Sequence, residues 1–133
     1  MPPDAPLVEE WLRKARRDLY MAALAAQNPA AAPDAWGFHC QQAAEKALKA
    51  FLHFHEREVE RTHDVDFLVL ECSAIDPAFG AWSEVAGMLT AFAVQYRYPG
   101  PADPTEEKLR EAMRAAESLV VAVEVRVRPS SEE

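Results

Sequence analysis

Glycine is scarce in this 133-residue sequence, with only four in all, and no glycine-rich loop of the kind that holds phosphates occurs. This lack argues against independent ATP or NAD binding of the familiar kinds. No apolar run approaches the roughly 18 residues that a membrane span requires. The N-terminus also lacks the basic and apolar regions of a secretory signal. We therefore expect a cytoplasmic protein with no membrane association.

Cysteine and histidine are too few and too scattered for a metal site. Cys40 and Cys72 fall inside predicted helices without a spaced partner, so we expect reduced, buried thiols. His53 and His55 are two residues apart and would point to opposite sides of a helix. No His-x-x-x-His or Cys-x-x-Cys pattern occurs. The sequence predicts no metal and no cofactor.

The net charge of −8 argues against nucleic acid or anionic lipid binding by the whole surface. One basic cluster remains, made of Arg13, Lys14, Arg16 and Arg17. It is interpreted as a solvated helix face, with phosphate contact as the alternative. No serine lies in a Gly-x-Ser-x-Gly pattern, so nucleophilic catalysis has little support.

Apolar residues recur at helical spacing in five segments, and half of all residues are hydrophobic. The predicted helices cover about 7–27, 33–58, a short helix opening at 62–64, 78–96 and 105–127. Alternating valines at 121–127 would also suit a strand, but no turn signal interrupts the helical period. Mostly short links predict an all-α, up-and-down antiparallel bundle. We expect a single domain over residues 1–133, with its core at about 7–127 and a frayed tail at 129–133.

The central predicted helix carries a polar block inside an apolar segment. The block comprises Gln41, Gln42, Glu45 and Lys46, and Glu45 precedes Lys49 by the four residues that favour a helical ion pair. One interpretation is that these side chains contact a ligand or a partner. The other is that buried hydrogen bonds of Gln42 and Glu45 fix the helix register.

Two further polar features have alternative interpretations. Arg97 lies between Tyr96 and Tyr98, a combination that suits contact with a phosphate and a base. Alternatively, the tyrosines anchor a loop while Arg97 pairs with an acidic residue such as Glu45 or Asp18. For His63, helix-start hydrogen bonding is the simpler interpretation, and ligand contact is the other.

Four blocks, taken in order, resemble the HEPN domain family. They are Ala15–Leu19 with Ala22, Phe38–Ala50, Thr62–Val65 with Leu68, and Arg97–Pro99. The resemblance covers about residues 10–125, and its second block is the most specific. It implies a small helical bundle that forms a homodimer. It also implies nucleotide or RNA binding and a minimal nucleotidyltransferase as partner, often in toxin–antitoxin-like pairs. Many members are metal-independent RNases.

The sequence departs from the RNase pattern of that family. Catalytic members carry an Arg followed after four to six residues by His, near the start of the last long helix. Counted from Arg97, these positions are Ala102, Asp103 and Pro104, and no histidine follows His63. Without an imidazole there, no general acid or base for attack by a ribose hydroxyl is evident.

Two hypotheses for function follow from these features. The favoured one is a non-catalytic HEPN binding or interaction module that presents Arg97, Tyr98 and His63 to a nucleotide, an RNA or a partner protein. Lys46 and Lys49 are additional contact candidates. The alternative is a metal-independent RNase in which His63 replaces the missing histidine beside Arg97. This alternative predicts RNA cleavage that requires both His63 and Arg97.

The aromatic content also suggests where a second copy of the chain would pack. Five short helices leave a surplus of apolar surface, which suits a subunit interface. The fourth predicted helix, with Phe79, Trp82, Phe92 and the small Gly87, is one candidate surface. The alternative is that these side chains all belong to the intrachain core.

Overall fold

The structure is a computed structural model that describes residues 5–100 and 102–128. Its elements are α1 (Ala5–Ala26), α2 (Pro33–Phe54), α3 (Val65–Ile75), the 3₁₀ helix η1 (Pro77–Trp82), α4 (Ser83–Val94), the 3₁₀ turn η2 (Gln95–Arg97) and α5 (Glu106–Val127). No strand occurs among these residues, so the all-α bundle is confirmed and the valine-rich segment is helical. None of the helices described combines the length and apolar character that crossing a bilayer demands.

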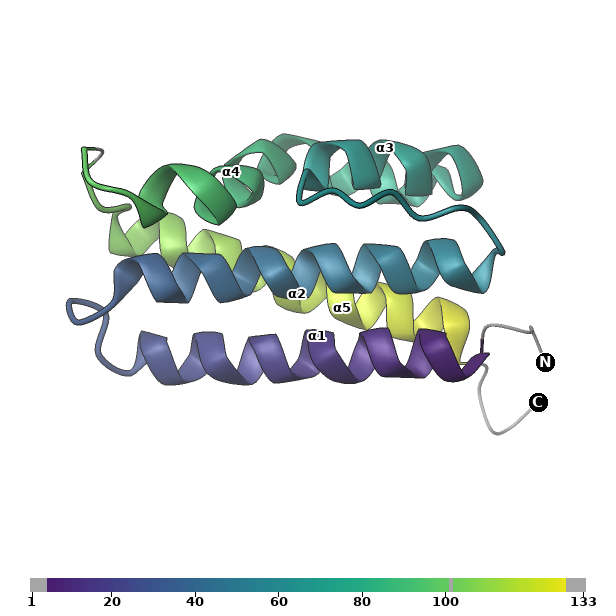
Figure 1. Cartoon of the computed structure of the whole chain (residues 1–133), viewed down its shortest axis with the longest axis horizontal. Helices are drawn as coiled ribbons and strands as arrows, with labels where there is room; N and C mark the ends of the chain where they lie inside the picture. Colours follow the sequence, from purple (N-terminus) through teal and green to yellow (C-terminus); the bar gives the residue numbers. More distant parts are fainter. Residues whose placement is uncertain (1–4, 101, 129–133) are drawn as a thin grey trace.

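Helix α2 lies at the centre of the bundle (Figure 1). It packs along α1 on one side, against α3 and α4 on the other, and over α5 behind. The connector at 55–64 runs back along α2, so α3 begins beside the middle of α2 rather than beside its end. The first turn of α1 and the last turn of α5 lie at one end of the bundle, and the loop between α4 and α5 lies at the other.

Local capping explains where several helices start. The Asp64 carboxylate accepts a hydrogen bond of 3.1 Å from the Phe67 amide and caps α3. The Thr105 hydroxyl accepts one of 3.2 Å from the Lys108 amide and caps α5. Asp76 caps η1 in the same way at 3.0 Å, followed by a proline in the first turn. These starts agree with the sequence-based predictions.

The end of α2 is earlier than expected. The predicted helix runs to about residue 58, whereas α2 ends at Phe54. Glu56 adopts a left-handed backbone conformation with φ of 55°. The Arg57 amide then donates to the Leu52 carbonyl at 2.9 Å and closes the helix end. A glutamate takes the place that glycine usually holds, which is why the sequence lacked a visible stop signal.

The fourth predicted helix is also divided differently. Residues 77–82 form 3₁₀ helix, α4 proper starts at Ser83, and a second 3₁₀ turn follows Val94. Capping by Asp76 starts the segment, and the Phe79 amide bonds the Asp76 carbonyl three residues back at 3.1 Å. This spacing is that of a 3₁₀ helix.

A continuous apolar core holds the helices together. Its largest fully buried side chains include Trp36, Phe51, Phe79 and Phe92, and burial of each stabilises the fold by about 1.5–3 kcal/mol. Phe79 and Phe92 are therefore intrachain core, which agrees with the alternative prediction for these two side chains, whereas Trp82 is partly buried and Gly87 is exposed. The larger apolar side chains exposed in the described part lie elsewhere: Leu7, Tyr20, Met21, Leu24, Leu70, Tyr98, Val121 and Val125.

Both cysteines are free thiols inside this core, as expected. Burial is the main cause that raises the pKa of Cys40 and of Cys72 to about 12. A thiol that stays protonated is a poor nucleophile and a poor metal ligand. Neither cysteine is therefore suited to chemistry in this fold.

Helices α2 and α4 approach closely at Gly37. A Cβ atom there would lie 2.9 Å from the ring of Phe92 and 3.2 Å from the side chain of Leu109. Phe92 is buried and cannot turn away without opening the core. The glycine is needed for space rather than for backbone flexibility.

Substitution Gly37→Ala is expected to destabilise the protein by about 1 kcal/mol, because overpacking outweighs the gain in helix propensity. Urea unfolding measures the change. Gly87→Ala is the matched control, since a Cβ there meets nothing closer than 3.7 Å. If Gly37→Ala were more stable than the wild type, the Phe92 ring would have to shift enough to make room for the added Cβ atom.

Candidate functional site

The polar block of α2 forms the centre of a buried hydrogen-bond network around Glu45. The Glu45 carboxylate accepts from Gln41 Nε2 at 2.8 Å, from Lys49 Nζ at 3.0 Å and from His63 Nδ1 at 2.8 Å. Gln42 adds a bond of 2.8 Å to the Gln41 side chain. We call these five residues the Glu45 network. Its members were singled out from sequence, and the fold brings them together.

Helical spacing and the path of the connector build this network. Gln41, Glu45 and Lys49 follow one another at four-residue intervals, so their side chains share one face of α2. His63 lies in the connector that runs back along α2, which places it beside this face. The Gln41 amide also donates to the His63 backbone carbonyl at 3.1 Å, which fixes that residue twice.

His63 is exposed although its partner is not. Its side chain is 70% exposed, whereas that of Glu45 is 5% exposed. Because Nδ1 donates to the carboxylate, Nε2 faces outward with no partner among the described residues. A carboxylate that orients an imidazole in this way is the arrangement used by general bases. The geometry also suits a simple tie between connector and helix.

A second buried carboxylate, Asp18 of α1, lies on the other side of the α2 polar block. It accepts from Lys46 Nζ at 2.5 Å and from His39 Nδ1 at 2.9 Å. We call these three residues the Asp18 network. No role for His39 was predicted from the sequence. The available signal was the position of Asp18, which falls on the apolar face of α1 between Ala15 and Ala22.

The two lysine contact candidates differ in accessibility. Lys49 is buried, and its ammonium lies 5.7 Å from the centre of the Trp11 ring as well as beside Glu45. Lys46 is partly exposed beside Asp18. Both ammonium groups are thus already neutralised by carboxylates within the chain.

The loop after α4 is separate from these networks. Tyr98 is exposed, while the Tyr96 ring packs on Phe92 with centroids 5.4 Å apart. The side chain of Arg97 lies outside the described residues. The suggested acidic partners of Arg97, Glu45 and Asp18, are both held by side chains of α2. Among the described residues, no hydrogen bond, ion pair or ring contact joins Tyr98 to His63 or to the polar block.

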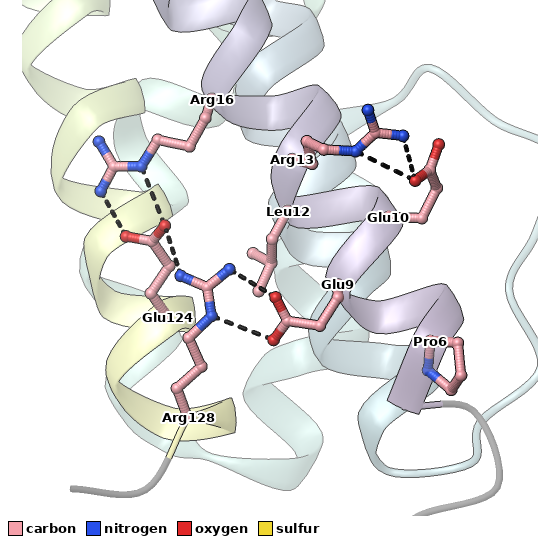
Figure 2. Close-up of a pocket in the computed structure, with 8 residues that line it drawn as sticks. All are labelled: Pro6, Glu9, Glu10, Leu12, Arg13, Arg16, Glu124 and Arg128. Carbon is pink, nitrogen blue, oxygen red and sulfur yellow. Dashed lines mark hydrogen bonds and ion pairs between the residues drawn. The ribbon is translucent and has the colours of Figure 1, made fainter. Parts of the chain in front are cut away.

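The basic cluster of α1 lies partly in a cleft of about 500 Å³ between α1 and the end of α5 (Figure 2). Arg16 pairs with Glu124, and Arg128 bridges Glu124 at 3.2 Å and Glu9 at 2.7 Å. Arg13 pairs with Glu10 on its own helix. Figure 2 shows these cations directed at carboxylates, so Arg13 and Arg16 are ion-paired rather than simply solvated.

No group of three or more histidine, cysteine or acidic side chains within residues 5–100 and 102–128 is arranged to hold a metal ion. The carboxylates of the two α2 networks are bonded to nitrogen donors instead.

Removing the negative charge of the Glu45 network is expected to be costly. In Glu45→Gln the buried Lys49 ammonium loses its counterion, and breaking a buried pair in this way costs about 3 kcal/mol. The double variant Glu45→Gln with Lys49→Met is expected to regain part of the loss, because it leaves no unpaired buried charge. Chemical unfolding of the wild type and the variants gives the coupling. If Glu45→Gln lowers the free energy of unfolding by well under 1 kcal/mol, the Lys49 ammonium is hydrated in the variant and does not need the carboxylate.

The cleft of Figure 2 predicts a pH-dependent contribution to stability. Hydrogen bonding to Arg16 lowers the pKa of Glu124 below its ordinary value of 4.5. Its ionised form therefore stabilises the fold above about that pH, and the contribution disappears as pH falls through the lowered pKa. We expect the difference in unfolding free energy between wild type and Arg16→Gln to shrink from neutral to acid pH.

The control for this pH series is Arg17→Gln, which removes an exposed charge from the same helix without breaking an ion pair of the described part. Its effect on unfolding should be small at every pH. An Arg16→Gln difference that stays constant down to acid pH would contradict a role for ionised Glu124.

Comparisons with known proteins agree with this architecture. The sequence matches the model of the HEPN domain over residues 8–126. The structure is similar to the crystal structure of an archaeal HEPN homologue, with a TM-score of 0.72 and 26% sequence identity over 91% of this chain and 98% of that one. A search of curated proteins found no match. The family model covers most of the chain, and the protein belongs to the HEPN domain family.

Proposed function

We propose that the protein is a non-catalytic HEPN module that binds a nucleotide or RNA at the exit of α4 through Arg97 and Tyr98. The observation that carries this proposal is the exposed Tyr98 ring directly after Arg97 in the turn that ends α4. An exposed aromatic ring stacks on a base, and a guanidinium binds phosphate. His63 is the third proposed contact, because its Nε2 faces outward.

Binding without cleavage is supported by the residues beyond Arg97. The positions where catalytic family members carry histidine are Ala102, Asp103 and Pro104, and Pro104 is buried. Lys46 and Lys49 would add little to a ligand contact, because each is held by a carboxylate. The affinity would therefore rest on few charges, in keeping with the overall net charge of −8.

A second candidate function is a metal-independent RNase that uses His63 with Arg97. One observation favours it: His63 Nδ1 is held by the buried Glu45 at 2.8 Å while the ring stays exposed. An imidazole oriented in this way could take a proton from a ribose hydroxyl. Arg97 would then stabilise charge on the phosphate.

Partners are proposed on separate grounds. A homodimer is supported by family membership and by exposed apolar side chains on α1 and α5, such as Met21, Leu24 and Val125. A minimal nucleotidyltransferase as partner, in a toxin–antitoxin-like pair, rests on the family resemblance alone.

The test is RNA binding and cleavage by the purified protein in EDTA. We expect binding without cleavage. Arg97→Ala should weaken binding by roughly tenfold and reduce the slope of log affinity against log salt by about 1, since one phosphate contact is lost. Tyr98→Ala should weaken binding while leaving the salt slope unchanged.

Arg17→Ala is the matched control, since it removes one exposed positive charge from α1. Equal weakening by Arg17→Ala and Arg97→Ala would indicate nonspecific attraction and overturn the proposed site. Cleavage that disappears in both Arg97→Ala and His63→Ala would instead establish the RNase. Cleavage that survives His63→Ala would exclude His63 as its base.

A further inference from the structure

A second cleft lies between the last turns of α1 and the first half of α5. Its volume is about 310 Å³, at the lower end of the range for small-molecule sites. The residues that line it are Ala23, Ala26, Trp36, Arg110, Met113, Arg114 and Glu117. We call it the Trp36 cleft. None of the residues proposed above for nucleotide or RNA contact lines it.

The indole of Trp36, which lines this cleft, has one hydrogen-bond donor without a partner in the described part of the chain. Trp36 is 1% exposed, and its Nε1 is buried without a hydrogen-bond partner in the described part of the chain. Buried donors in proteins are almost always paired, because an unpaired one is unfavourable. Trp11 Nε1 is also buried without a partner among the described residues, whereas Trp82 donates its indole N–H to the Ser118 hydroxyl at 3.1 Å.

The charges of the Trp36 cleft are only partly compensated. Arg110 lies over the Trp36 ring, 5.5 Å from its centre, and pairs with Glu106 at 2.9 Å. Arg114 and Glu117 are one helical turn apart on α5, and neither has a hydrogen bond or ion pair to any described residue. The cleft thus presents one cation and one anion that form no ion pair with a described residue, although the charge of Glu117 also acts on Arg16.

The electrostatic effect of Glu117 extends into the interior. After burial, its negative charge is the second cause of the raised pKa of Cys40, whose thiol contacts the Met113 sulfur at 3.7 Å. Its carboxylate would therefore repel a simple anion that entered beside Met113. A ligand of this cleft has to satisfy both signs of charge.

We propose that the Trp36 cleft binds a small zwitterion with an apolar side chain, of the type of a free aliphatic amino acid. The ligand carboxylate accepts from Arg114 and from the Trp36 indole N–H, with Arg110 alongside. The ligand ammonium pairs with Glu117. The side chain lies on the apolar floor of Ala23, Ala26 and Met113. The cleft supplies each of these groups without breaking an ion pair between described residues.

The experiment is a titration of the full chain, followed by the three tryptophan indole signals in proton–nitrogen correlation spectra. The probes are L-leucine, isocaproate, which lacks the ammonium group, and isoamylamine, which lacks the carboxylate. Trp11→Phe and Trp82→Phe assign the Trp36 signal by elimination and leave the core tryptophan in place. We expect L-leucine at millimolar concentration to shift the Trp36 signal with saturation. The signals of the other two indoles should not shift.

Charge variants separate the two ends of the ligand. Arg114→Gln should weaken binding of L-leucine and isocaproate by about tenfold and leave isoamylamine unchanged. Glu117→Gln should weaken L-leucine to a similar extent and strengthen isocaproate, because it removes the repelling carboxylate. Arg17→Gln and Glu107→Gln are matched controls, since both residues are exposed and lie outside the cleft.

Three outcomes would overturn the proposal: no shift of the Trp36 signal with any probe, equal shifts of all three indoles, or equal weakening by the control variants. A shift with isocaproate that exceeds the shift with L-leucine would replace the zwitterion by a simple carboxylate and contradict the role of Glu117. None of these results depends on RNA binding, so they leave the proposed function untouched.

Discussion

The arrangement of the bundle depends on two carboxylates that are removed from water, Glu45 on α2 and Asp18 on α1. A buried carboxylate is tolerated only when nitrogen donors surround it, and each of these has at least two within 3.0 Å. Asp18 ties α1 to α2, and Glu45 ties the connector to α2. The geometry of these donors sets how α1 and the connector lie against the central helix, within a bundle that the apolar core holds together.

Much of the fold could be predicted from sequence because its signals are local. The apolar period of each helix, the caps at Asp64 and Thr105 and the proline after Asp76 depend on neighbours within a few residues. The early end of α2 at Phe54 could not be predicted, because Glu56 takes a left-handed conformation that its side chain does not encode. The division of the fourth segment at Ser83 likewise depends on hydrogen-bond spacing rather than on composition.

The candidate site likewise contains contacts that local sequence spacing predicts and contacts that it does not. Gln41, Glu45 and Lys49 were predictable as one group, since a helix places four-residue neighbours on one face. The contact of His63 with Glu45 spans 18 positions and arises only because the connector turns back along α2. The same holds for the pairing of His39 with Asp18. Contacts between helices and a returning loop have no period in the sequence, so only the fold reveals them.

The ion pair between Glu9 and Arg128 has a geometric consequence. It joins the beginning of α1 to the end of α5 at one pole of the bundle, while the loop between α4 and α5 lies at the other pole. A protein or tag fused at either end of the helical body would thus be attached at the end of the bundle opposite to that loop.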